Sequence, residues 1–175
     1  MKFTIKLSDI KYLSKYTNLL QRVYENTYTN TKIGLTKECF SKEIFNTVNT
    51  QNYLRSNLIN TENQKTWFAF DNDKLIGSIT LQNKGREYEL RGFYVDIEYQ
   101  GKGTGKLLLK KVKEFAGDKD IVLDIYAHNG KTINIYKKWG FKIDKKKGIF
   151  YRHWPEWPEE LKVKSIYMRL TTAKD

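Results

Sequence analysis

The sequence predicts an α/β (α+β) fold in which helices flank a mixed, mostly antiparallel sheet. Three observations predict it: segments that alternate polar and apolar residues, segments with apolar residues three or four positions apart, and one continuous apolar run. Their order, β-α-α-β-β-β-α-β-α-β-β, gives about seven strands and four helices. Because no repeat and no Pro- or Ser-rich linker interrupts this order, residues 1–175 are expected to form a single domain.

The predicted strands differ in their burial. Residues 65–85 contain two strands joined by the turn DNDK, whereas the run DIVLDIYA indicates a central strand buried on both faces. The last two segments are expected to form a closing antiparallel pair. The strand segments are residues 2–7, 65–85, 86–95, 120–127, 141–154 and 162–170.

The predicted helices lie between these strands. Residues 8–28 begin with Ser-Asp and have apolar residues three or four apart, and residues 35–59 give a second helical stretch, broken near Asn49. A third helix follows a glycine-rich loop, and residues 130–140 form a short helix that ends at Gly140. The apolar face of the third helix consists of Leu108, Val112, Phe115 and Ala116.

The composition favours a folded, cytoplasmic protein. Hydrophobic residues make up 39% of the chain and aromatic residues 14%, enough to bury a core. No apolar run is long enough for a membrane span or a signal peptide. Cys39 is the only cysteine, which rules out an internal disulfide and fits a reducing compartment. One cysteine and two histidines, far apart in the sequence, show no ligand spacing, so no metal site is expected.

The net charge of +12 favours an anionic partner: nucleic acid, a membrane surface or a phosphorylated small molecule. Lysines are spread along the whole chain, and no basic arm, helix-turn-helix or RNA-binding signature is present. A nucleic-acid binder is therefore the minor alternative, and membrane association is not expected. The lysine run at 145–147 is interpreted as a solvated turn.

The glycine loop YQGKGTGK, residues 99–106, joins a predicted strand to a predicted helix. The first turn of a helix has free N–H groups, and glycine lets the backbone approach an anion closely. A P-loop is excluded because Gln100 and Leu107 stand where Gly and Ser/Thr are needed. A Rossmann loop is excluded because the spacing is G-x-G-x-G, far from the start of the chain. A simple helix-entry turn is the structural alternative.

The remaining pattern, Gln/Arg-x-x-Gly-x-Gly/Ala, resembles the pyrophosphate loop of the GNAT superfamily of N-acetyltransferases. Gln100, Gly103 and Gly105 match it. Downstream, IYAHNGKTINIYKKWGF resembles the second motif of that family, in which Asn129 lies seven residues before Tyr136 and the pair GF follows. The resemblance covers roughly residues 74–141 and extends to the element order of the whole chain.

The resemblance implies that acetyl-CoA is the co-substrate. It would lie between two parallel strands that splay apart, 88–95 and 120–127, with strand backbone on the pantetheine arm and loop N–H groups on the pyrophosphate. Lys138 is a weaker candidate of the set. The implied cofactor-binding residues are Phe93, Tyr94, Val95, Gln100, Gly101, Lys102, Gly103, Thr104, Gly105, Lys106, Asn129, Tyr136 and Lys138.

The implied reaction is attack of a neutral amine on a thioester. An alkyl ammonium has a pKa near ~10 and must first lose a proton, and the departing thiolate must be protonated or stabilised. By the resemblance, Tyr136 is the general acid. Glu87 and Glu89, two apart on one strand, are the candidate bases; pairing with surface lysines, or a water chain in their place, is the alternative. His128 is a candidate relay or a structural residue, and His153 is expected to be structural.

The chain ends also resemble the spermidine/spermine branch of the superfamily, through RVYENTYTNT, FSKEIFN and GIFYRHWPEWPEELKVKSIYMRL. A small-molecule amine, first of all a polyamine, is therefore the expected acceptor, with peptide N-termini or lysines as the alternative. The segment WPEW is interpreted as a hydrophobic plug or dimer contact, or as a wall of the acceptor pocket. A cationic acceptor needs local carboxylates, and four are expected to cluster: Glu25, Glu43, Glu87 and Glu89.

One other class remains open, a family member that binds acyl-CoA as a sensor without turnover. The presence of Tyr136 argues against it. Homodimers are common in the superfamily, but no segment specifies an interface.

Overall fold

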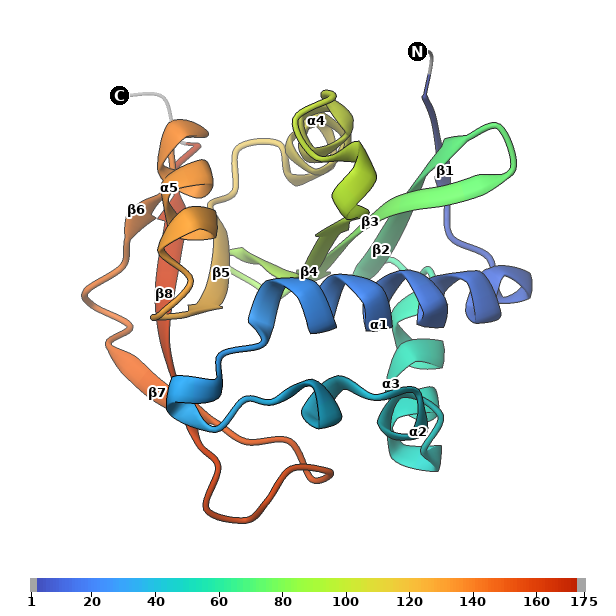
Figure 1. Cartoon of the computed structure of the whole chain (residues 1–175). Coiled ribbons are helices and arrows are strands. Elements are labelled where there is room, and N and C mark those ends of the chain that lie inside the picture. The colour runs from blue at the N-terminus through green and yellow to red at the C-terminus, as the bar shows by residue number, and fades with distance from the viewer. Residues whose placement is uncertain (1–2, 173–175) are drawn as a thin grey trace.

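A mixed sheet of eight strands forms the centre of the computed structural model, which describes residues 3–172. The strand order is β1-β2-β3-β4-β5-β8-β6, and β7 also pairs with β8 (Figure 1). The mostly antiparallel sheet is confirmed, since β4 with β5 is the one parallel pair within residues 3–172. The strands are β1 (Thr4–Leu7), β2 (Gln64–Asp71), β3 (Lys74–Asn83), β4 (Tyr88–Val95), β5 (Ile121–Tyr126), β6 (Lys142–Ile143), β7 (Ile149–Arg152) and β8 (Val163–Leu170).

Helices cover both faces of this sheet, α1 to α3 on one side and α4 and α5 on the other (Figure 1). Two apolar clusters match this division, one around Leu19 and Phe68 under α1 and one around Ile79 and Leu108 under α4. Among residues 3–172, no helix combines the length and apolarity that crossing a bilayer requires. The helices are α1 (Leu13–Tyr28), α2 (Lys42–Phe45), α3 (Val48–Leu58), α4 (Thr104–Ala116) and α5 (Gly130–Lys138).

The second helical stretch is more divided than predicted. It consists of a 3-10 turn at Lys37–Phe40, then α2, then α3. Ser41 and Thr47 cause the divisions, because both have extended backbone and act as N-caps. The Ser41 side chain accepts the N–H of Ile44, and the Thr47 side chain accepts the N–H of Thr50.

The predicted strand over residues 141–154 is two strands, β6 and β7, and this raises the strand count from seven to eight. Asp144 separates them, because its Oδ1 accepts the backbone N–H groups of Lys146 and Lys147 and turns the chain. The lysine run therefore forms a turn as predicted. Both strands pair with β8, β6 near its end and β7 near its start.

The predicted splay of two parallel strands is confirmed. Pairing of β4 with β5 is confined to residues 88–89 and 121–122. Further along, the register of β3 with β4 shifts between Thr80 and Leu81, which leaves Arg91 as the extra residue of a β-bulge. A bulge bends the strand that carries it. Since β5 stays paired with β8 along its whole length, β4 diverges from β5 after the bulge.

Candidate active site

A cavity of about 390 Å³ lies where β4 and β5 diverge. From the sheet it is lined by residues 89–94 of β4 and 123–126 of β5. Side chains of α1 and α3 reach it from one face and side chains of α5 from the other. The loop after β7 contributes a further wall. The cavity therefore joins the two faces of the sheet through the opening between the strands.

Tyr136 of α5 lines this cavity and is 8% exposed. Its ring contacts Phe93, Trp139 and Phe141, with centroid distances of 6.3, 5.9 and 5.3 Å. Burial raises the pKa of Tyr136 well above its ordinary value of 10.0. The hydroxyl therefore keeps its proton at neutral pH and is available there as a donor.

Asn129 is the N-cap of α5, placed directly after β5. Its Oδ1 accepts the backbone N–H of Thr132 at 3.3 Å, which fixes the orientation of the amide. The Nδ2 group is buried and has no hydrogen-bond partner among the described residues. Buried donors without partners are rare, so this amide is suited to an acceptor atom of a ligand.

The glycine loop has free backbone donors where it enters α4, whereas the N–H groups of Gln100 and Lys102 donate to the carbonyl oxygens of Ile97 and Tyr99 at 3.3 and 3.4 Å. Gly101 and Gly103 have φ angles of 77° and 91°, a left-handed conformation that glycine adopts without strain. Thr104, Gly105 and Lys106 begin the helix, and within residues 3–172 their N–H groups have no backbone acceptor. Free N–H groups at a helix N-terminus form an anion site. Of the expected pyrophosphate contacts of residues 100–106, those from the N–H groups of residues 104–106 stay a prediction that this geometry allows, whereas the N–H groups of Gln100 and Lys102 already have acceptors.

The residues expected to hold the pantetheine arm lie on the diverging half of β4. Phe93, Tyr94 and Val95 pair with β3 on one side and have no strand partner on the side of β5. The Phe93 ring stacks on Trp139 at 5.6 Å, whereas Tyr94 points to α1 and shares a 2.6 Å hydrogen bond with Tyr24. A free strand edge can bind an extended ligand through its backbone. Lys138 is exposed and lies outside the cavity lining.

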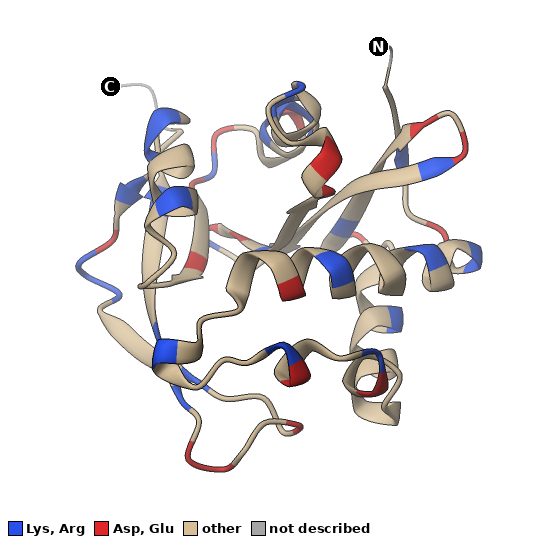
Figure 2. Cartoon of the chain, viewed as in Figure 1, with Lys and Arg blue, Asp and Glu red and all other residues tan. Residues whose placement is uncertain are grey.

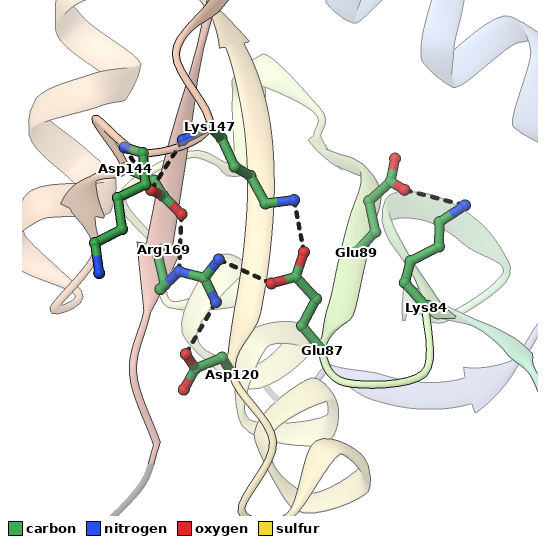
Figure 3. A network of polar contacts seen from close by, with 8 residues as sticks. Lys84, Glu87, Glu89, Asp120, Asp144, Lys147 and Arg169 are labelled. Atoms are coloured by element: carbon green, nitrogen blue, oxygen red, sulfur yellow. Dashed lines mark hydrogen bonds and ion pairs between the residues drawn. The ribbon is translucent and has the colours of Figure 1, made fainter.

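The two candidate bases are separated by the structure. Glu87 lies outside the cavity lining and forms ion pairs with Lys147 and Arg169 at 2.7 and 2.8 Å (Figure 3). Burial raises the pKa of Glu87, but these two partners outweigh it, so the pKa is lowered. Glu89 lines the cavity and pairs with Lys84 at 3.2 Å. Only Glu89 is therefore placed to act on an acceptor.

The predicted cluster of four carboxylates is wrong. Glu25 pairs with Lys37 and Glu43 is exposed on α2, and neither lines the cavity. Two other acidic residues line it, Asp124 of β5 and Glu156 of the loop after β7. Asp124 was detectable as the only charge within an apolar run.

Asp124 forms an ion pair with Arg152 of β7 at 2.7 Å. Burial raises the pKa of Asp124, and the nearby guanidinium only partly offsets this effect. The pair joins β5 to β7 within the cavity wall, since both residues line it.

The WPEW segment is both a wall of the cavity and a hydrophobic plug. Trp154 and Glu156 line the cavity, whereas Trp157 is buried and donates its Nε1–H to the carbonyl oxygen of Cys39 at 3.2 Å. His153 is structural as predicted, because its Nδ1 lies 2.9 Å from the carbonyl oxygen of Leu161. His128 is exposed, stacks on the ring of Tyr126 and does not line the cavity.

A mixed sheet that opens between two parallel strands, with a cavity in the opening and a glycine-rich helix N-terminus beside it, defines an α/β protein with a candidate ligand site between the strands. The particular family follows from comparison with known proteins. A model described as the acetyltransferase (GNAT) family matches residues 30–141, and the chain belongs to this family. The family uses acetyl-CoA as co-substrate.

Two curated relatives match part of the chain. The N-alpha-acetyltransferase RimI of Mycobacterium tuberculosis is 30% identical over 82 residues, which are 45% of this chain and 52% of that protein. The spermine/spermidine N(1)-acetyltransferase of Bacillus subtilis is 35% identical over 66 residues, 35% of this chain and 43% of that protein. The chain spans between about a quarter and half of the length of the curated relatives it matches.

A solved structure matches almost the whole fold. It is the PaiA N-acetyltransferase of Thermoplasma acidophilum in complex with coenzyme A, with a TM-score of 0.76 and 20% sequence identity. The match covers 98% of this chain and 99% of that chain. The likeness therefore extends beyond the residues of the family model to α1 and to the strands after residue 141.

Proposed function

We propose that this chain transfers the acetyl group of acetyl-CoA to a primary amine, with a polyamine such as spermidine or spermine as the acceptor. The observation that carries the proposal is the cavity in the β4–β5 opening, which has a protonated Tyr136 at one side and acidic and aromatic side chains at the other. Family membership supports the acetyl transfer. The relative from Bacillus subtilis supports the choice of polyamine.

The co-substrate would be held by three sets of groups with free hydrogen-bonding capacity. The loop N–H groups of residues 103–106 would bind the pyrophosphate, and the free edge of residues 93–95 would bind the pantetheine arm. The Asn129 amide would donate to a carbonyl of that arm. Acetyl-CoA supplies the acyl group as an activated thioester.

Two proton transfers are assigned to residues of the cavity. The Tyr136 hydroxyl, which burial keeps protonated, would donate to the sulfur that leaves, and the second proton that the amine nitrogen loses on forming the amide would restore it. Glu89 would accept the proton of the incoming ammonium, directly or through water, because it is the one of the two candidate bases that lines the cavity. Glu87 would not take part, since it is ion-paired elsewhere.

An N-terminal amine of a protein or peptide is the second candidate acceptor. The relative from Mycobacterium tuberculosis, named an N-alpha-acetyltransferase, favours it. A peptide would have to place its chain past Trp154 of the cavity wall, whereas a thin, flexible polyamine fits a volume of about 390 Å³ more easily.

Free-thiol release from acetyl-CoA with a panel of amines tests the proposal. The panel contains spermidine, spermine, putrescine, lysine, a basic peptide and a peptide with a free N-terminal alanine. We expect turnover on the polyamines, because the acidic and aromatic wall favours a cation. Turnover only on the peptides would shift the proposal to the second candidate, and binding of acetyl-CoA with no turnover on any amine would favour a sensor.

The substitution Asn129→Asp tests the cofactor side of the site. Aspartate still accepts the N–H of Thr132, so α5 keeps its cap, but it cannot donate and adds a negative charge. We expect the KM for acetyl-CoA to rise by roughly tenfold, with the melting temperature unchanged or higher. Isothermal titration of coenzyme A checks binding without turnover. An unchanged dissociation constant would contradict the assigned role of the amide.

A further inference from the structure

Some of the charged side chains on the acceptor side of the cavity belong to ion pairs, and others do not. Glu89 is paired with Lys84 at 3.2 Å, and Asp124 is paired with Arg152 at 2.7 Å. Within residues 3–172, Arg91 and Glu156 have no ion pair. The five charged residues of the lining are Glu89, Arg91, Asp124, Arg152 and Glu156.

Glu156 is held in place by neutral donors. The Thr50 hydroxyl donates to its Oε1 at 3.4 Å, and the Thr47 hydroxyl lies 3.1 Å from the same oxygen, with its one proton shared between Glu156 and the Ile44 carbonyl oxygen at 3.0 Å. Thr47 is also the N-cap of α3, so the carboxylate lies at the start of that helix. Among the described residues, Oε2 has no hydrogen-bond partner, and it is not closed off from solvent. The carboxylate is therefore fixed in position while one oxygen remains free for a ligand.

Arg91 is better satisfied than Glu156. Its guanidinium lies over the Tyr53 ring at 5.5 Å and donates weakly to Gln64 Oε1 at 3.5 Å. The Tyr53 ring therefore already holds a cation, and the Trp154 ring stacks on that of Trp157 at 5.3 Å. Of the two lining charges without an ion pair in residues 3–172, Glu156 is the one with an oxygen left free for a ligand.

The rest of the molecule opposes such a ligand. Lysine and arginine are spread over α1, α4, α5 and the connection from β6 to β7 (Figure 2). A chain with a net charge of +12 repels a cation at long range. A cationic acceptor therefore needs a local anion without a counter-ion, and Glu156 is the lining carboxylate that meets this condition.

We propose that Glu156 binds a second, non-reacting ammonium group of the acceptor and so selects amines with two or more positive charges. This inference rests on the proposed acetyl transfer and names the substrate class within it. The reacting amine lies toward Tyr136, and the second ammonium lies at the free oxygen of the Glu156 carboxylate.

The test compares three acceptors of equal length: a diaminoalkane, the corresponding monoamine and the corresponding ω-amino carboxylate. The variant is Glu156→Gln, because the glutamine oxygen still accepts from Thr47 and Thr50 while the charge is lost. We expect the KM for the diamine to rise roughly tenfold or more, and the KM values for the monoamine and acetyl-CoA to stay unchanged. Glu159→Gln is the control, since Glu159 is exposed on the same loop and outside the lining.

Two results would overturn the inference. One is an unchanged ratio of diamine to monoamine KM in Glu156→Gln. The other is a wild-type preference for the amino carboxylate that is lost in Arg91→Gln, which would assign the selecting charge to Arg91.

Calorimetric binding of spermidine, measured with coenzyme A present, separates this inference from the proposed function. If wild-type turns over no amine but binds spermidine more tightly than Glu156→Gln does, acetyl transfer fails and the ammonium site stands.

Discussion

Replacing Tyr136 with phenylalanine is expected to lower kcat for acetyl transfer by about 100-fold, because general acids contribute roughly 10²–10⁴ to rates. The ring packs against Phe93, Trp139 and Phe141, and phenylalanine preserves these contacts. The KM for acetyl-CoA and the free energy of unfolding should therefore change little. Steady-state thiol release and urea unfolding measure the two quantities on one preparation.

The loss of kcat in Tyr136→Phe should not depend on pH near neutrality. Burial raises the pKa of Tyr136 well above 10.0, so the hydroxyl stays protonated from pH 6.5 to pH 9. The loss in kcat should consequently be the same at both ends of this range. Tyr88→Phe is the matched control, since Tyr88 is buried on β4 but does not line the cavity. A wild-type kcat in Tyr136→Phe would show that Tyr136 is not the general acid. Water would then be the donor to the leaving sulfur.

The cofactor side of the site was predictable because it is built from contiguous sequence. Gln100, Gly103 and Gly105 lie in one loop, and Asn129 and Tyr136 lie on one helix, so their spacing fixes their relative positions. Backbone groups do much of the binding there, and they do not depend on a partner elsewhere in the chain. The resemblance implied the opening of the strands, whereas no local pattern indicated the bulge in β4 at which they diverge.

The acceptor side was less predictable because it combines segments that are far apart in the chain. Glu87 and Glu89 look equivalent in sequence, but Lys147 and Arg169 from the last third of the chain neutralise only Glu87. Glu156 becomes a site residue only because its loop folds back onto the start of α3.

Short polar residues in the sequence mark two boundaries between elements that the prediction lacked. Ser41 and Thr47 are typical N-cap residues, and they divide the second helical stretch where they occur. Asp144, which begins the lysine turn, likewise signals the division of β6 from β7. Apolar periodicity continues through both divisions, so it does not show where the chain turns.

Replacing Arg169 with leucine is expected to cost about 2 kcal/mol of unfolding free energy, between the values typical of exposed and buried ion pairs, because three partly buried carboxylates lose their shared counter-ion. Arg169 of β8 contacts three carboxylates, those of Glu87, Asp120 and Asp144, at 2.8, 2.9 and 2.8 Å (Figure 3). Glu87 precedes β4 and Asp120 precedes β5. The network therefore links β4, β5 and β8 at the end where β4 and β5 are still paired. Urea unfolding at pH 7 measures the loss, and Arg86→Leu, an exposed arginine, is the control.

The loss should depend on pH in a defined direction. Burial raises the pKa values of Glu87 and Asp144, but hydrogen bonds from Arg169 and its neighbours outweigh burial, so both pKa values are lowered. A lowered pKa gives stability that is present above the ordinary carboxyl range, about 4, and that is lost as pH falls through the folded-state values. Wild-type should therefore lose stability on acidification below about pH 4, and the gap between wild-type and Arg169→Leu should shrink there. A gap that stays constant between pH 7 and pH 3.5 would mean that Arg169 stabilises the sheet by packing on β8 and not by its charge.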